Sequence, residues 1–281
     1  MTDSTQWQTN VGSVWAEEWR RTDRSFAALA PHLEAAILDA APDTGAVLDI
    51  GCGAGSTSLA LAAARPTLSV TGIDLSPDLV AVAAERGADL PNVRFQVADA
   101  ADPPPPILGG AHDLAISRHG VMFFADPVAA FTTIRDLLKP GAPLVFSCFQ
   151  SPNRNPWASQ LAEAVGGEPL DASGAAPGPF AFADPDHVAD ILREAGWSDG
   201  HARDVDYTYV VGEGADPVGD AQSFLTRIGP AARALANLSE ADRSDALARL
   251  HAVLERHRFA GTVTFPAAAW IWTARAGGDA A

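Results

Sequence analysis

The chain has 281 residues, 47% of them hydrophobic, so we expect a folded globular protein. Its formal net charge of -16 argues against nucleic acid as an obligatory partner, because two polyanions repel each other. Two cysteines are too few for a disulfide scaffold or a structural zinc site. No secretory pattern opens the chain, and no apolar run is long enough to span a membrane. We therefore expect a cytoplasmic monomer or homodimer without membrane insertion.

The first periodic segment, residues 11–40, is predicted to be helical, with Pro31 separating two helices. Trp15 and Trp19 are four residues apart, so they would share one face of a helix. These aromatic side chains either pack the helix onto a sheet edge or belong to a lid over a ligand. The sequence leaves both interpretations open.

An apolar run, residues 46–50, leads into a loop with Gly51, Gly53 and Gly55, and a helix-like run follows at 58–64. This order predicts a strand, a glycine loop and a helix that together bind a nucleotide-like ligand. Glycine allows a tight turn with positive φ and close approach of a ligand, and the helix N-terminus favours negative charge. The dinucleotide fingerprint would also need glycine at position 56, where this chain has Ser56.

Acidic residues mark three successive strand ends. Asp49 precedes the glycine loop, Asp74 ends the predicted strand 68–74, and Asp99 ends the predicted strand 93–99. Ligands of parallel sheets bind beyond the carboxyl ends of the strands, where an acid such as Asp74 can accept both hydroxyl groups of a ribose. Each acid alone fits a surface turn, but the three in order favour a nucleoside site.

Strands at 113–117 and 144–149, with a helix at 128–138 between them, continue the alternation and predict right-handed parallel crossovers. The segment 151–182 is rich in Pro, Gly and Ala, contains one expected helix near 158–165, and is predicted to be a lid or substrate loop. The remaining expected elements are a helix at 186–195, a strand near 202–211, helical segments between 221 and 256, and a last strand at 263–275.

The glycine loop with its preceding acid resembles motif I of class I S-adenosylmethionine-dependent methyltransferases. Over about residues 11–275 the chain resembles the ubiquinone/menaquinone-biosynthesis-like branch, methyltransferase types 11 and 25. The resemblance implies an α/β fold with a Rossmann-like, seven-stranded, mostly parallel sheet flanked by helices, plus an N-terminal helical lid and an inserted helical cap. We expect one domain over 1–281, divided into a lid (1–43), a cofactor-binding core (44–150), cap segments (151–183 and 213–260) and segments that complete the sheet (184–212 and 261–276).

The resemblance also implies S-adenosylmethionine as cofactor and S-adenosylhomocysteine as product. The methionine and ribose part of the cofactor would lie over the glycine loop, with the ribose on Asp74 and the adenine beside Asp99. The residues expected to contact it are Asp49 (methionine ammonium), Gly51, Cys52, Gly53 and Gly55 (loop), Asp74 (ribose), Leu75, Asp99 and Ala100 (adenine), Ser117 (beneath the methionine) and Trp19 (lid).

His119 follows the fourth strand, where the family has phenylalanine. Its imidazole is a candidate general base for a methyl acceptor, although it can equally serve only in packing. Met122, Phe123 and Trp157 are candidates for an apolar substrate pocket, with core packing as the alternative. Asp126 alone does not form a metal cluster, so we expect no metal.

The predicted reaction is methyl transfer to an O, N or C atom of a small, apolar metabolite. The alternatives are a non-catalytic S-adenosylmethionine-binding protein and, less favoured, an NAD-dependent oxidoreductase.

Overall fold

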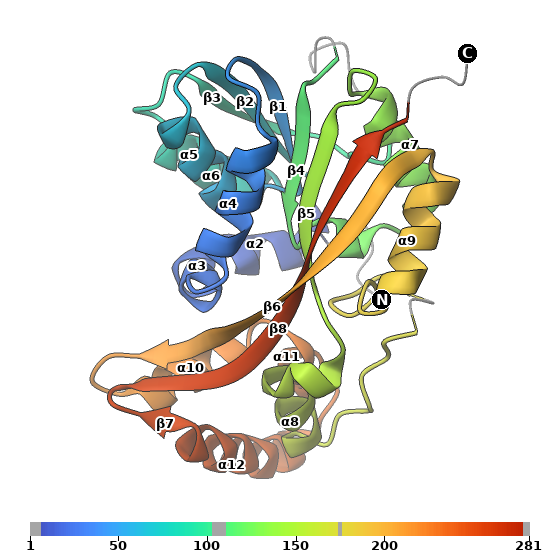
Figure 1. Cartoon of the computed structure of the whole chain (residues 1–281). Coiled ribbons are helices and arrows are strands. Elements are labelled where there is room, and N and C mark those ends of the chain that lie inside the picture. Colours follow the sequence, from blue (N-terminus) through green and yellow to red (C-terminus); the bar gives the residue numbers. More distant parts are fainter. Residues whose placement is uncertain (1–6, 103–110, 174–175, 278–281) are drawn as a thin grey trace.

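The computed structural model describes residues 7–102, 111–173 and 176–277. Within these ranges eight strands form one sheet in the order β3-β2-β1-β4-β5-β8-β6, with β7 paired to β8 (Figure 1). The strands are β1 (Gly45–Ile50), β2 (Leu68–Asp74), β3 (Val93–Val97), β4 (Leu114–Arg118), β5 (Pro143–Phe149), β6 (Trp197–Glu213), β7 (Arg258–Phe259) and β8 (Thr262–Ala276). Strands β1 to β5 are parallel, and β8 runs antiparallel to both β5 and β6. The predicted Rossmann-like, mostly parallel sheet is confirmed, with the two-residue β7 as an addition.

The helices in the described ranges are α2 (Asn10–Glu17), α3 (Trp19–Phe26), α4 (Ala30–Ala40), α5 (Ser56–Ala64), α6 (Pro77–Arg86), α7 (Pro127–Asp136), α8 (Pro156–Ala164), α9 (Pro185–Glu194), α10 (Pro217–Leu225), α11 (Pro230–Leu235) and α12 (Glu240–Arg256). Two short 3-10 turns lie at η2 (Val121–Phe123) and η3 (Pro152–Arg154). Helices α4, α5 and α6 cover one face of the parallel sheet, and α7 and α9 cover the other (Figure 1).

Several helix starts follow directly from the sequence. The side chains of Ser76, Asp126 and Asp184 each accept a backbone N–H of the first turn, and proline occupies the next position in all three helices. Ser239 caps α12 in the same way, accepting from the N–H of Asp242. These caps fix where the crossover helices begin, and so fix the lengths of the loops at the functional edge of the sheet.

The N-terminal segment differs from the expected pair of helices. It forms three helices, and the first break falls at Glu18, whose buried carboxylate binds Arg21 and Arg227. Trp15 and Trp19 therefore lie on different helices rather than on one face of the same helix. The sequence could not indicate this break, because Arg227 lies far away in the chain.

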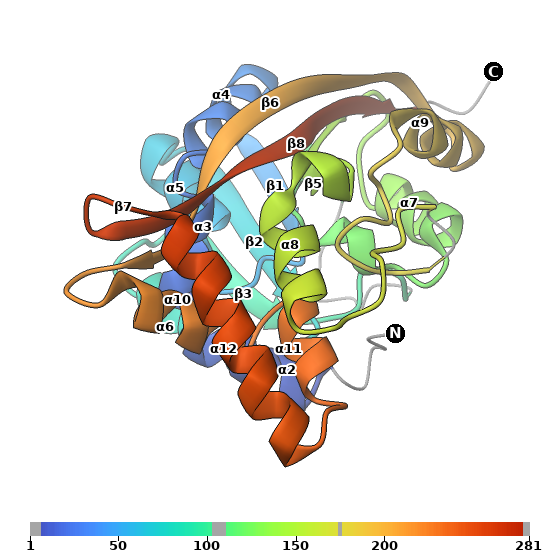
Figure 2. The same cartoon turned by 90° about the horizontal axis from the view of Figure 1, so that it is seen from below.

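Strands β6 and β8 extend well beyond the rest of the sheet. They stay paired from Trp197 and Ala276 to Glu213 and Thr262, so the 17-residue β6 is longer than the strand expected near 202–211. Helices α8, α10, α11 and α12 lie against the distal half of these two strands and form a separate layer below the parallel sheet in Figure 1. In Figure 2, which is seen from below, this layer lies in front of the parallel sheet. We call this layer the cap.

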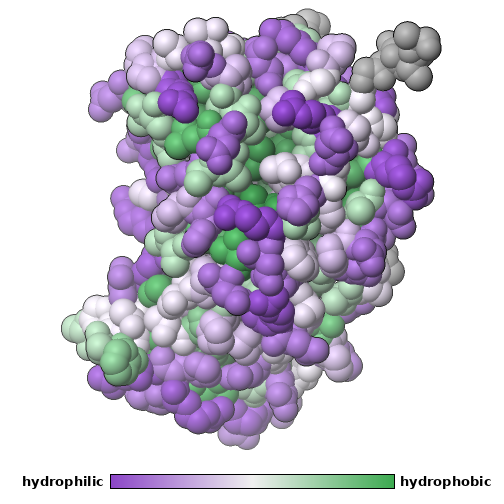
Figure 3. All heavy atoms as spheres, in the orientation of Figure 1, coloured by the Kyte–Doolittle hydropathy of each residue, from purple (hydrophilic) through white to green (hydrophobic). Residues whose placement is uncertain are grey.

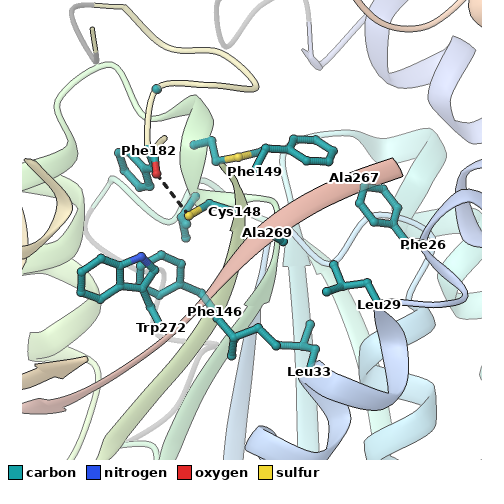
Figure 4. Packing of buried hydrophobic residues seen from close by; sticks show 14 of the residues in the cluster. Phe26, Leu29, Leu33, Phe146, Cys148, Phe149, Phe182, Ala267, Ala269 and Trp272 are labelled. Carbon is teal, nitrogen blue, oxygen red and sulfur yellow. Dashed lines mark hydrogen bonds between the residues drawn. The ribbon is translucent and has the colours of Figure 1, made fainter. Parts of the chain in front are cut away.

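A continuous apolar core joins the sheet to its surroundings (Figure 4). Leu29 and Leu33, the second from α4, pack toward β5 and β8, where the rings of Phe146 and Trp272 stack with centroids 6.1 Å apart. The Cys148 thiol donates a hydrogen bond to the Phe182 carbonyl at 3.5 Å, so the segment after α8 is anchored to β5.

The face seen in Figure 3 is covered largely by hydrophilic side chains. An apolar exception is the β7–β8 hairpin, where Phe259 is 78% exposed. None of the helices in the described ranges has the length and apolar character of a membrane-spanning segment.

Candidate functional site

A cavity of about 410 Å³ lies where the ends of β1, β2, β4 and β5 meet the N-terminal helices and the cap. This volume is within the usual range for small-molecule sites. Its wall combines backbone and acids from the strand ends with rings from α2, α3 and the cap. The residues discussed below that line it are Trp19, Asp23, Phe26, Gly51, Cys52, Gly53, Asp74, Leu75, Asp99, Ala100, Arg118, His119, Met122, Phe123, Phe149, Trp157, Tyr209, Phe224 and Ile228.

The glycine loop needs its glycines for two different reasons. Gly51, Gly53 and Gly55 have φ values of 61°, 55° and 84°, in the left-handed region that side chains disfavour. A Cβ at Gly51 would lie 2.9 Å from the Gly120 Cα, so β1 and the loop after β4 are in close backbone contact. At Gly53 a Cβ would meet nothing within 4 Å and would instead occupy space along the cavity wall. The loop therefore exposes bare backbone to a ligand at Gly53.

Asp74 ties this loop to the end of β2. Its carboxylate accepts hydrogen bonds from the Gly53 N–H at 2.8 Å and the Ser76 N–H at 2.9 Å. Burial raises the pKa of Asp74, and these backbone donors act in the opposite direction. The predicted ribose acceptor thus lies in the cavity wall, held by the backbone.

Leu75, Asp99 and Ala100, which the family resemblance assigns to an adenine site, line the same end of the cavity. Asp99 is partly exposed and accepts a hydrogen bond from the Ala101 N–H at 2.9 Å. We call the wall formed by the glycine loop, Asp74, Leu75, Asp99 and Ala100 the glycine end.

Asp49, Gly55 and Ser117, which are also expected near the cofactor, are not among the residues that line the cavity. Asp49 is buried and accepts from the Ser58 hydroxyl at 2.6 Å, so its carboxylate binds α5 behind the loop. Its other oxygen has no partner among the described residues, and burial raises its pKa to about 7. Ser117 donates to the Ile50 carbonyl at 2.7 Å, which ties β4 to β1. Gly55 packs against Phe95. The contacts of these three residues hold the glycine loop in place.

His119 lies in the wall with an unusual backbone, φ 61°. Its N–H donates to the Ser147 carbonyl at 3.0 Å, and its Nδ1 lies 2.8 Å from the Ser147 hydroxyl. Nε2 is buried without a partner in the described ranges. Burial, and next the charge of Arg118, lowers the pKa of His119 well below 6.5, so the imidazole is neutral at pH 7.

Aromatic rings surround His119 on the side away from the glycine loop. Phe149 and Phe26 have ring centroids 4.3 and 4.8 Å from the imidazole. Trp157 stacks on Tyr209 at 4.6 Å, and burial raises the pKa of Tyr209 to about 12. The cap adds Phe224 and Ile228. We call this wall, Phe26, His119, Phe149, Trp157, Tyr209, Phe224 and Ile228, the aromatic end.

Met122, Phe123 and Trp157 line the cavity, as predicted for the substrate pocket, and so does Trp19. Asp126 is a helix cap whose carboxylate accepts from the Ala129 N–H. Among the residues that the structure describes, no three or more His, Cys, Asp or Glu side chains are arranged to hold a metal ion.

An ion pair in the wall was not predicted. Asp23 of α3 accepts from Arg118 at 2.9 Å and from Arg86 at 2.8 Å, and Arg86 also lies over the Trp19 ring at 4.0 Å. These residues come from three separate segments, and no local spacing relates them. Tyr209, Phe224 and Ile228 were missed for the same reason.

Comparison with protein families identifies the core of the chain. Residues 47–141, which include the glycine loop, Asp74, Asp99 and His119, match the family model described as a methyltransferase domain. This stretch, about a third of the chain, is similar to a methyltransferase domain. The N-terminal helices and the cap lie outside the matched residues, so the methyltransferase domain match covers the glycine end and only part of the aromatic end.

Curated relatives are similar to about half of the chain. The ubiquinone biosynthesis O-methyltransferase of Cereibacter sphaeroides (strain ATCC 17029 / ATH 2.4.9) is 33% identical over 156 residues, which cover 53% of this chain and 59% of that protein. The chain spans between 22% and 59% of the length of the first curated relatives that it matches.

Two solved structures share the fold. A methyltransferase from Bacillus halodurans, described as putative, has a TM-score of 0.57 at 16% identity, with 88% of this chain and 100% of that chain covered. Phosphoethanolamine N-methyltransferase 2 of Haemonchus contortus, in complex with S-adenosyl-L-methionine, has a TM-score of 0.55 at 18% identity, with 99% and 61% covered.

Proposed function

We propose that the protein is an S-adenosylmethionine-dependent methyltransferase that moves a methyl group to an O, N or C atom of a small, largely apolar acceptor. The observation that carries this proposal is the position of Asp74. Its carboxylate is fixed by the Gly53 and Ser76 amides at the end of β2, in the same cavity as an aromatic wall. Such an acid can accept ribose hydroxyl groups.

The residues at the glycine end fit the cofactor. The methionine and ribose part would lie along Gly51, Cys52 and Gly53, where the space at Gly53 is free of other atoms. The adenine would lie beside Leu75 and Asp99, with the backbone of Ala100 in reach. When bound, the cofactor supplies a methyl group that its sulfonium cation already activates. The chain then has to orient an acceptor in line with that methyl group and exclude water.

The aromatic end supports an apolar acceptor. Its walls are rings and aliphatic side chains, and the described lining residues include only one Arg or Lys, Arg118, which is paired with Asp23. A strongly charged acceptor would lose its hydration there without compensation. The relatives include a protein named as an O-methyltransferase and one named as an N-methyltransferase, so they do not decide whether the accepting atom is oxygen or nitrogen.

For His119 we propose contact with the acceptor and, where the acceptor carries an acidic proton, its removal. The imidazole is neutral, and with Nδ1 beside the Ser147 hydroxyl, Nε2 is the ring nitrogen that has no partner among the described residues. Replacing His119 by alanine is expected to reduce turnover by about 10²- to 10⁴-fold, the usual contribution of a general base. Affinity for S-adenosylhomocysteine should change less than threefold, and unchanged turnover would remove His119 from the mechanism.

The test of the function is a labelled-methyl transfer assay against a panel of small phenols, amines and quinols, with calorimetry of S-adenosylhomocysteine and NAD in parallel. We expect S-adenosylhomocysteine to bind and one apolar class to be methylated. Binding without transfer to any compound would favour the non-catalytic alternative. Tight binding of NAD alone would favour the oxidoreductase.

A further inference from the structure

Arg118 is the only Arg or Lys among the described residues that line the cavity. The same wall contains Asp23, Asp74, Asp99 and Asp126, and the chain carries a net charge of -16. Any ligand carboxylate that enters this negative field needs a cation to stabilise it. Arg118 is the group that can supply one.

Arg118 is placed beside the glycine loop by the sheet. It ends β4, which pairs with β1 through Asp49 and Ile116, and the following Gly120 contacts Gly51. Its side chain is 15% exposed. Only Nη2 donates to a described residue, Asp23, so Nε and Nη1 keep donors for a ligand.

We propose that Arg118 binds the carboxylate of the cofactor's methionine moiety, and that its ion pair with Asp23 couples this contact to the docking of α3 over the cavity. This inference rests on the proposed function. The planar guanidinium presents parallel donors that match a carboxylate, which makes arginine well suited to this task. The Arg118 guanidinium also lies 5.3 Å from the centre of the Phe26 ring at the aromatic end. An anionic acceptor is therefore the competing partner, and the two ligands compared below distinguish it from the cofactor.

The coupling to α3 follows from how Asp23 is shared. One oxygen accepts from Arg118 and the other from Arg86, which also donates to the Ala54 carbonyl in the loop. Trp19 and Phe26 of the same helix line the cavity. The carboxylate of the cofactor and the carboxylate of Asp23 would therefore both bind Arg118, and α3 would close over an occupied site.

The test compares two ligands that differ only at the amino-acid end. S-Adenosylhomocysteine carries the carboxylate, and 5′-methylthioadenosine is the same thionucleoside without the amino-acid part. Calorimetry should show that Arg118→Met lowers the affinity for S-adenosylhomocysteine by about 10- to 100-fold, the effect of losing a charge-assisted hydrogen-bonded pair. The affinity for 5′-methylthioadenosine should change less than threefold. Arg118→Lys should recover part of the lost affinity and guards against misfolding of the methionine variant.

Arg86→Met is the matched control, since it removes the other partner of Asp23 without removing the proposed carboxylate receptor. It should weaken both ligands by a similar factor. Equal loss of both ligands in Arg118→Met would show a merely structural role and overturn the inference, and so would unchanged affinity. If the wild-type protein binds 5′-methylthioadenosine and not S-adenosylhomocysteine, the inference fails and nucleoside binding stands. If it binds neither, the proposed function fails with it.

Discussion

The two ends of the cavity are built in different ways. The glycine end consists of a loop and strand ends between residues 49 and 100, and its shape depends on positive φ angles and backbone hydrogen bonds. The aromatic end combines Phe26, Phe149, Trp157, Tyr209 and Phe224, side chains from five separate elements. Local sequence therefore builds the glycine end, the proposed cofactor site, whereas the aromatic end, the proposed acceptor site, depends on tertiary packing.

This difference has a consequence for substitutions. A side chain added at the glycine end changes the backbone path, while one removed at the aromatic end changes cavity shape and leaves the loop intact. Effects on cofactor affinity and on acceptor turnover should therefore separate according to the end that is altered.

The largest effect is expected for Trp157→Ala at the aromatic end. Trp157 is 4% exposed and packs on Phe149 and Tyr209, so its removal should cost about 3–5 kcal/mol of unfolding free energy. Denaturant unfolding measures this, and Trp157→Phe is the conservative control. In folded protein, affinity for S-adenosylhomocysteine should stay within threefold of wild type. A tenfold loss would contradict the separation of the two ends.

The matched pair Gly51→Ala and Gly53→Ala probes the glycine end. Both alanines would adopt positive φ, which costs roughly 1–2 kcal/mol. Only the Cβ at Gly51 meets backbone, 2.9 Å from Gly120, so that variant should lose about 3 kcal/mol in total. Chemical denaturation should give a lower free energy of unfolding for Gly51→Ala than for Gly53→Ala. The Gly53→Ala protein should stay folded but bind the cofactor more weakly. Equal stabilities would mean that the Gly51–Gly120 contact is not tight.

Asp49→Asn tests the buried support behind the loop through pH. Burial raises the pKa of Asp49 to about 7, from an ordinary value near 3.8, so the folded state holds this proton more tightly than the unfolded state. Wild-type stability should therefore decline as pH rises from 4 to 7, relative to the variant, by about 3 kcal/mol. Unfolding curves of both proteins across that window check this. A gap that does not change with pH would refute the raised pKa.

The smallest effect is expected for Asp220→Asn, which loosens the cap. Asp220 of α10 binds Arg21 at 2.8 Å and Arg24 at 2.7 Å on α3, and it is 20% exposed. Because partly exposed pairs are screened by water and salt, the loss should be about 1 kcal/mol and should shrink at high salt. Thermal melts at low and high ionic strength measure it. If Asp220→Asn raises the KM for the acceptor and leaves the affinity for the cofactor unchanged, the substitution acts at the aromatic end.

Sequence reasoning reached the glycine end well because its signals are local. The glycines, Asp74 and Asp99 lie at strand ends that periodicity alone can place, and the sheet came out as predicted. It did not predict the hydrogen bonds that hold Asp49 and Ser117, since the direction of a side chain at a strand end depends on pleat and register. Asp49 instead points at Ser58 on the helix behind the loop.

The aromatic end was reached only in part. The sequence indicated Trp157 and His119 as candidate site residues, but the residues that contact them lie far away in the chain. Ser147 binds His119 from the neighbouring strand, and Tyr209 stacks on Trp157 from β6. No local pattern in the sequence predicts the Asp23–Arg118 ion pair, because the two residues lie far apart in the chain and only the fold brings them together.

The most direct test of the central claim is a crystal structure of the protein with S-adenosylhomocysteine. We predict ribose hydroxyl groups on Asp74, adenine beside Leu75 and Asp99, and the sulfur directed toward the aromatic end. A ligand with its adenine among Phe149, Trp157 and Tyr209, or crystals grown at saturating concentration that contain no ligand, would contradict the account.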